Sequence, residues 1–187
     1  MEKWKIAMLG SFNVGKTTLA RQVSLCLFFS LGYRRQILVD DKKCFVEGFL
    51  DDISLTNCSH QRIDRNSDAQ GFILIYSISH RPSFERIQEN YFHLLRKVRG
   101  IHVPIFLVGN KRDQEYQRAV SKEEGAALAA ELCCDFFETS AKTAQNVERT
   151  FVAFVRLLRQ LREAANADGA ADGIMKKERR HSQCMVM

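Results

Sequence analysis

Residues 10 to 17 read Gly10-Ser11-Phe12-Asn13-Val14-Gly15-Lys16-Thr17, directly after the apolar run at residues 6–9 and before a helical pattern that opens at Thr18. A strand, a G-x-x-x-x-G-K-T loop and a helix in this order indicate a phosphate-binding loop, which we assign to residues 10–18. Its glycines permit a tight turn whose backbone N–H groups point at phosphate oxygens. Lys16 is the candidate catalytic cation, expected to reach the β- and γ-phosphates, and Thr17 is expected to bind Mg²⁺ through its hydroxyl. The sequence therefore predicts a nucleoside triphosphate site rather than an ordinary glycine turn.

The base preference depends on a second motif, Asn110-Lys111-Arg112-Asp113, which follows the apolar run at residues 105–108. The Asp113 carboxylate can accept two parallel hydrogen bonds from the N1–H and 2-amino groups of guanine, whereas adenine offers no such pair. Asn110 is expected to tie this strand to the phosphate loop, and the stem of Lys111 to cover one face of the purine. A polar turn after a buried strand would explain the motif alone but fits poorly beside a phosphate loop. We therefore expect GTP or GDP as the ligand.

A third motif agrees with the first two. Residues 135–138 have the pattern of a last strand, and Thr139-Ser140-Ala141-Lys142 follow them before a long amphipathic pattern. In order and spacing the three motifs resemble the Ras family of small GTPases, and the resemblance runs from Lys3 to about Arg162. It implies a P-loop NTPase of the α/β class, with a mostly parallel six-stranded sheet flanked by about five helices.

The resemblance also implies roles for residues of the base site. The Ala141 N–H would contact the guanine O6, Ser140 would steady Asp113, and Lys142 would pack on the base. Phe28 resembles the aromatic residue that covers the other face of the guanine. Because Phe28 lies among apolar neighbours, a core role is the alternative for this side chain.

The chain departs from the family in the effector loop, whose threonine normally reaches Mg²⁺ and the γ-phosphate. Here the stretch at residues 29–32 runs straight into residues 33–40, which resemble the second strand, and no threonine occurs between Thr18 and Thr56. The γ-phosphate then lacks a contact that distinguishes the triphosphate from the diphosphate state, and switching requires such differential contacts.

A second departure follows the strand-like run at residues 44–50, where the family has D-x-x-G and then a glutamine that orients the attacking water. This chain has Asp51-Asp52-Ile53-Ser54-Leu55. Asp51 can still hold Mg²⁺ through a water, but Ser54 replaces the glycine, and Leu55 replaces the glutamine and cannot position a water. Gln61, in a polar stretch further on, is an alternative source of that amide.

The third departure is Phe12, at a loop position where the family usually has glycine. A bulky side chain there is expected to obstruct both the glutamine and the arginine finger of an activating protein, unless it turns toward solvent. An arginine finger accelerates hydrolysis by about 10³ to 10⁵, so its exclusion together with Leu55 predicts slow hydrolysis of GTP.

Composition and patterning predict one domain, residues 1–164, followed by a flexible basic tail, residues 165–187. The chain has 187 residues, 45% of them hydrophobic, which is enough for a single core. Strand-like runs alternate with helical patterns, as in a parallel sheet covered by helices. Helix starts are predicted near Ser83, in a capping box at residues 121–124, and at Asn146. The final helix carries an apolar stripe made of Val147, Phe151, Phe154, Leu158 and Leu161.

The tail ends in a cysteine with the spacing of a prenylation motif. The last four residues, Cys184-Met185-Val186-Met187, form a Cys-a-a-X sequence that predicts farnesylation of Cys184 and carboxyl methylation. One lipid anchors only marginally, and the basic cluster Lys176, Lys177, Arg179 and Arg180 can add about 1 kcal/mol per charge near an anionic leaflet. We therefore expect the cytoplasmic face of the plasma membrane as the location and its inner leaflet as a partner.

The net charge of +6 does not indicate nucleic-acid binding, because no aromatic-basic platform accompanies it. The six cysteines have no metal-ligand spacing and are expected to be reduced cytosolic thiols. We expect a monomer that meets effectors and exchange factors. Three hypotheses stay open: a signalling GTPase with impaired hydrolysis, a pseudo-GTPase scaffold that holds nucleotide without switching, and a gene-model or splicing artefact that removed a normal effector loop.

Overall fold

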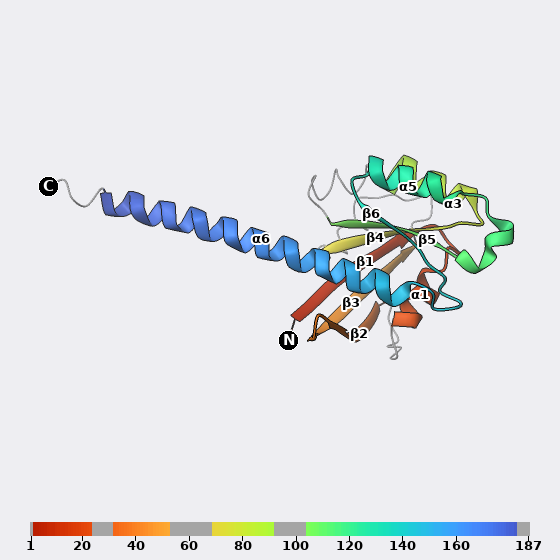
Figure 1. Ribbon diagram of the computed structural model, residues 1–187, viewed down its shortest axis with the longest axis horizontal. Coiled ribbons are helices and arrows are strands. Elements are labelled where there is room, and N and C mark those ends of the chain that lie inside the picture. Colours follow the sequence, from red (N-terminus) through yellow and green to blue (C-terminus); the bar gives the residue numbers. More distant parts are fainter. Residues whose placement is uncertain (1, 24–31, 53–68, 92–103, 183–187) are drawn as a thin grey trace.

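The computed structural model describes residues 2–23, 32–52, 69–91 and 104–182 (Figure 1). Its elements in chain order are β1 (Glu2–Gly10), α1 (Lys16–Val23), β2 (Gly32–Val39), β3 (Lys42–Asp52), β4 (Gly71–Ser77), α3 (Arg81–Arg86), the π-helical turn η1 (Ile87–Tyr91), β5 (Ile105–Asn110), the 3₁₀ segment η2 (Arg112–Gln117), α5 (Lys122–Glu131), β6 (Asp135–Glu138) and α6 (Val147–Ser182). The six strands form one sheet in the order β2-β3-β1-β4-β5-β6. All neighbouring strands are parallel except β2 and β3, which confirms the mostly parallel sheet predicted from the sequence.

The central strands are buried along their whole length. Every residue of β4 and of β5 is buried, which is typical of parallel strands covered by helices on both faces. Side chains of β1 alternate between two hydrophobic clusters, with Trp4, Ile6 and Met8 on one face and Ala7 and Leu9 on the other. This alternation follows from the two-residue period of a strand.

Each face of the sheet is covered by its own pair of helices. The first cluster includes Leu19 of α1 and Phe151 of α6, and the second includes Phe84 of α3 and Leu128 of α5. Figure 1 shows the same arrangement, with α1 and α6 on one side of the sheet and α3 and α5 on the other. In a sheet of this kind, ligands bind outside the carboxyl ends of the parallel strands, where the predicted motifs lie.

The antiparallel edge is a tight hairpin. Strands β2 and β3 are joined by Asp40 and Asp41, whose φ values are 51° and 58°. Positive φ at both positions matches a two-residue turn of the type that suits the right-handed twist of a hairpin. The second strand predicted at residues 33–40 is thus confirmed to within one residue, as β2.

Two helix starts test the predictions from local sequence. The capping box is confirmed, because Ser121 Oγ accepts from the Glu124 N–H at 3.1 Å while Glu124 Oε2 accepts from the Ser121 N–H at 2.9 Å. The prediction that a helix begins directly after Ser83 was wrong, because α3 begins at Arg81 and Ser83 lies inside it. Pro82 explains the earlier start, since its fixed φ and missing N–H suit the first turn of a helix.

Helix α6 begins at Val147, directly after Asn146, as predicted. Four residues of its predicted stripe are buried, but Leu161 is 42% exposed and is not part of the core. The helix continues through most of the predicted flexible tail, as far as Ser182, and Figure 1 shows this part projecting away from the sheet. Five of the eight residues at 164–171 are alanine, the strongest helix former, and that propensity explains the difference. The division into domain and tail at residue 164 stays a prediction.

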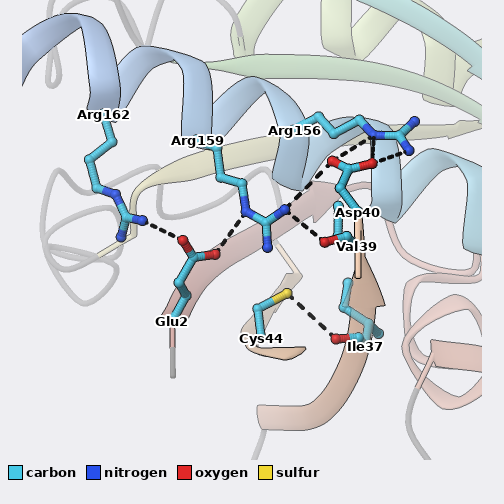
Figure 2. Close-up of polar contacts among 8 residues, drawn as sticks. All are labelled: Glu2, Ile37, Val39, Asp40, Cys44, Arg156, Arg159 and Arg162. Atoms are coloured by element: carbon cyan, nitrogen blue, oxygen red, sulfur yellow. Dashed lines mark hydrogen bonds and ion pairs between the residues drawn. The ribbon is translucent and has the colours of Figure 1, made fainter. Parts of the chain in front are cut away.

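Three arginines on α6 hold the helix to the sheet (Figure 2). Arg159 donates to Glu2 at 2.8 Å and to the backbone oxygen of Val39 at 2.9 Å. Arg156 bonds to Asp40 in the hairpin turn, and Arg162 donates to the second oxygen of Glu2 at 2.7 Å. Arg162 also lies over the Trp4 ring, 4.3 Å from its centroid. These contacts join the first strand, the hairpin and the last helix.

The arginines also change the acidity of their partners. Partial burial raises the pKa of Glu2, but the hydrogen bond and charge of Arg159 and the charge of Arg162 outweigh it and leave that pKa below its usual value. The hydrogen bond from Arg156 lowers the pKa of Asp40. Carboxyls with depressed pKa values stabilise the fold above their unfolded pKa, and this contribution is lost as pH falls through the folded value.

We predict that Arg159→Met costs about 2 kcal/mol of unfolding free energy, because it leaves the Val39 carbonyl without its donor and removes one of the two arginines that bond to Glu2. Arg156→Met is the matched control, since the Arg156 side chain is 54% exposed against 10% for Arg159, and solvent screens the pair that it loses. Urea unfolding measures both variants. Equal shifts of the urea midpoint would contradict this assignment.

Candidate functional site

The loop between β1 and α1 is shaped by two close approaches. A Cβ at Gly10 would collide with the Ile75 carbonyl oxygen of β4, and a Cβ at Gly15 would collide with the side-chain nitrogen of Asn110. Gly15 has φ of 95° and Asn13 has φ of 61°, so the backbone turns tightly at both positions. Only glycine fits at residues 10 and 15, as the phosphate-binding motif requires.

Lys16 lies across the loop that it follows. Its side chain is buried, and Nζ donates to the carbonyl oxygens of Gly10 at 3.0 Å and of Ser11 at 2.7 Å. The hydroxyl of Ser11 is also buried and finds no hydrogen-bond partner within the described part of the chain. A buried ammonium, an unpartnered hydroxyl and the start of α1 meet at one turn, and this donor set fits a phosphate group.

Asn110, the last residue of β5, connects three segments. Its side-chain nitrogen donates to the backbone oxygen of Val14 in the phosphate loop at 2.8 Å. Its side-chain oxygen accepts from the Thr139 hydroxyl at 3.2 Å and from the Ala141 N–H at 3.1 Å. Asn110 is itself 1% exposed. The expectation that Asn110 ties the strand to the loop is confirmed, and its link to the third motif is an addition.

The two predicted base-reading segments also contact each other directly. Ser140 Oγ donates to Asp113 Oδ1 at 2.6 Å, as the resemblance implied, and the Arg112 N–H donates to the Thr139 carbonyl at 3.0 Å. Asp113 is half-buried. The Ala141 N–H, expected to contact guanine O6, is donated to Asn110 in this structure, so a base would have to share that N–H with Asn110.

The remaining predicted residues lie around this junction. Lys111 has φ of 66°, so the backbone turns into a left-handed conformation directly after the buried strand β5. Lys142, in the third motif, and Thr18, at the end of the phosphate-binding loop, are both exposed. Phe12 is 80% exposed, so its ring projects from the loop into solvent instead of filling the loop. This outcome matches the alternative stated for Phe12.

The predicted Mg²⁺ ligands come from two neighbouring elements. Thr17 is an exposed residue in the first turn of α1, and the parallel register pairs Leu9 with Asp51 and Gly10 with Asp52. Position 51 therefore lies at the end of the sheet where the phosphate loop begins. The described residues contain no ready-made cluster of three metal-ligating side chains. A hydroxyl and a carboxylate suit Mg²⁺, which usually takes few protein ligands and keeps several waters. Phe28, Ser54, Leu55, Gln61 and Cys184 lie outside the described residues.

Known proteins with similar sequences were compared with the chain. A model of the Ras family matches residues 5–160. Ras-like protein B of Aspergillus fumigatus is 36% identical over 202 residues, covering 92% of this chain and 84% of that protein. Ras-like protein 1 of Pyricularia oryzae is 37% identical, covering 87% and 77%, and protein ras-2 of Neurospora crassa is 33% identical, covering 98% and 96%.

The chain belongs to the Ras family of small GTPases. The six-stranded sheet and the covering helices described above are the fold of that family. Within this Ras-family protein the three motifs lie at the same end of the sheet, at the carboxyl ends of β1, β5 and β6.

Three further residues at the site escaped the sequence analysis. The Thr139 hydroxyl bonds to Asn110, and Arg118 forms an ion pair with Glu138 at 2.6 Å. Glu138 carried a signal, because a carboxylate that ends a strand directly after two phenylalanines is expected to be buried and then needs a partner. Arg118 carried none, since it lies in a polar stretch that looks like an ordinary loop.

We predict that Asn110→Ala destabilises the protein by about 3 kcal/mol, because the Val14 carbonyl, the Thr139 hydroxyl and the Ala141 N–H would all lose their partner in the interior. Gln114→Ala is the control, since within the described residues this amide accepts one hydrogen bond, from Ser79, and the loss should be about 1 kcal/mol. Urea unfolding without added nucleotide measures both. A loss at position 110 no larger than that at position 114 would refute the junction.

Proposed function

We propose that this Ras-family protein binds GTP and GDP with Mg²⁺ and acts in signal transduction from the cytoplasmic face of the plasma membrane, hydrolysing GTP slowly. The observation that supports nucleotide binding best is the junction at Asn110. One buried amide joins the phosphate loop to both segments that the family uses to read guanine.

Guanine selection is assigned to the half-buried carboxylate of Asp113. Ser140 holds one oxygen of that carboxylate from one side, which fixes its orientation toward the place of the base. Lys111 and Lys142 lie beside it and would cover a purine with their stems, with Phe28 proposed for the opposite face. An adenine would leave the carboxylate without donors, and that loss disfavours ATP.

Phosphate binding is assigned to residues 10–18. The loop N–H groups, the Lys16 ammonium and the Thr17 hydroxyl would hold the phosphates, with Asp51 near Mg²⁺ through a water. Mg²⁺ would supply positive charge on the β- and γ-phosphate oxygens. The chain's own contribution is position and charge, because phosphoryl transfer needs little else from the protein.

Slow hydrolysis is inferred from Leu55, which offers no polar atom to orient a water. Phe12 projects from the loop into solvent, so its ring gives this inference no steric support. GTP would persist once it is bound.

A pseudo-GTPase scaffold is the second candidate function. In the sequence, the stretch that carries the effector loop in the family is shortened and holds no threonine between Thr18 and Thr56, and β2 already begins at Gly32. Without its threonine, GTP and GDP would make nearly the same contacts, and a ligand that contacts two states equally shifts neither. In that case nucleotide would stabilise a lipid-anchored platform for partners.

We predict that purified protein loaded with γ-³²P-labelled GTP and Mg²⁺ retains the nucleotide and releases phosphate slowly in a single turnover. The double variant Phe12→Gly, Leu55→Gln should release phosphate at least about tenfold faster, because it restores an amide that can orient water. Release of phosphate at the same rate by both proteins would refute the role given to Leu55. Failure of the wild-type protein to retain any guanine nucleotide would overturn the proposed function.

We predict that Cys184→Ser moves the full-length protein from membranes to the soluble fraction of cells at low salt, because the basic cluster binds too weakly alone. Cys133→Ser is the matched control, since Cys133 is an exposed free thiol outside the Cys-a-a-X sequence. Fractionation and mass spectrometry of the C-terminal peptide measure location and farnesylation. A Cys184→Ser protein that stays on the membrane would contradict the proposed anchor.

A further inference from the structure

Arg118 has an unusually complete set of partners for a residue in a surface loop. Its Nε donates to Glu115 Oε1 at 2.8 Å, and Nη2 donates to Glu115 Oε2 at 2.7 Å and to Glu138 Oε2 at 3.0 Å. Its Nη1 donates to Glu138 Oε1 at 2.6 Å and to the Val120 carbonyl at 3.0 Å. A guanidinium has five N–H donors in a rigid planar fork, and here all five are used. Lysine, with one ammonium, cannot make this set of bonds.

The partners of Arg118 belong to the two segments that carry the guanine motifs. Glu115 lies in η2, two residues after Asp113, and Glu138 is the last residue of β6, directly before Thr139-Ser140-Ala141. The Glu138 backbone carbonyl also accepts from Asn146 at 2.9 Å, which fixes the same strand end from the other side. Arg118 therefore bridges the segment of Asp113 to the segment of Ser140 and Ala141.

We propose that Arg118 is a positioning residue for guanine selection, which sets the separation between the Asp113 carboxylate and the Ala141 N–H through its paired bonds to Glu115 and Glu138. This inference rests on the proposed function, since it assumes that these two groups read the base. The hydrogen bonds of Arg118 among the described residues go to Glu115, Val120 and Glu138, none of which is a residue assigned to the phosphate or the base.

Burial explains why this bridge holds a geometry. The Glu138 side chain is 6% exposed and that of Arg118 is 18% exposed, so solvent screens their pair weakly. The bonds to Glu138 are bidentate, which fixes the angle between the two groups as well as their distance. Glu115 is 65% exposed, so its half of the bridge is weaker and can be removed without opening the core.

Direct contacts between the two segments remain when Arg118 is removed. Ser140 still bonds to Asp113, and the Arg112 N–H still donates to the Thr139 carbonyl. These contacts keep the segments together but fix only one oxygen of the carboxylate. We therefore expect a variant of Arg118 to bind nucleotide less tightly and to read the base less accurately, rather than to lose the site.

The test compares GDP with inosine diphosphate, which keeps the N1–H of guanine but lacks its 2-amino group. In the full-length Arg118→Gln protein, we expect GDP to dissociate about tenfold faster and the ratio of GDP to inosine diphosphate affinity to fall at least about threefold. The reason is that the ratio measures the bond between the 2-amino group and Asp113. Fluorescent-nucleotide displacement in Mg²⁺ buffer gives both quantities.

Arg81→Gln is the matched control. Arg81 also joins two elements through two glutamates, Glu85 in its own helix and Glu124 in α5, but neither glutamate belongs to a segment that carries a guanine motif. It should leave both the GDP dissociation rate and the affinity ratio unchanged. Glu115→Gln is the second variant, because it cuts only the exposed half of the bridge and should lower the ratio in the same direction if Arg118→Gln fails to fold.

A lowered ratio in the Arg118 and Glu115 variants, with Arg81→Gln unchanged, would support the proposal. A lowered melting temperature with an unchanged ratio would overturn it, since Arg118 would then serve stability alone. If the wild-type protein binds GDP and neither the Arg118 nor the Glu115 variant changes the GDP dissociation rate or the affinity ratio, this inference is refuted and the proposed function stands. Wild-type protein that binds no GDP would overturn the proposed function, and this role with it.

Discussion

The site depends on one buried side chain. A primary amide offers two donors and one acceptor oxygen, and Asn110 uses both kinds of group to join the phosphate loop at Val14 to Thr139 and Ala141. The approach is possible because Gly15 carries no Cβ, which would collide with the amide nitrogen. Segments separated by about a hundred residues of sequence are thereby fixed relative to one another, and a nucleotide that spans them meets a preformed frame.

The sheet supplies the stiffness that this frame needs. Strands β4 and β5 are buried along their full length, and each face of the sheet packs its own helices, so the carboxyl ends of β1, β5 and β6 cannot shift independently. The arginine contacts of α6 lie at the opposite end of the sheet, where they join the β2–β3 turn and the start of β1 to the last helix (Figure 2). Fixed strand ends are what allow single hydrogen bonds to determine the geometry of a site.

The fold and most of the site could be predicted from the spacing of the motifs. Each motif requires a turn directly after a strand, as in G-x-x-x-x-G-K-T, N-K-x-D and the residues after the last strand. The capping box at Ser121 was readable for the same reason, since its two bonds are local. Arg118 was not readable, because its role comes from Glu115 and Glu138, which the fold alone brings together. The helical tail was missed because glycine and aspartate at residues 165–173 outweighed alanine in the interpretation.

The departure from the family pattern at Phe12 falls where it costs the fold little. Phe12 is 80% exposed, so a large ring at that position displaces nothing in the core, whereas Gly10 and Gly15 each face atoms that a single methyl group would strike. In the proposed function, nucleotide binding therefore depends on buried positions that the exposed ring of Phe12 does not occupy. The residues assigned to guanine are held by buried bonds to one another, and Phe12 stands outside that network. A chain built in this way can vary at position 12 while the frame proposed for the nucleotide stays intact.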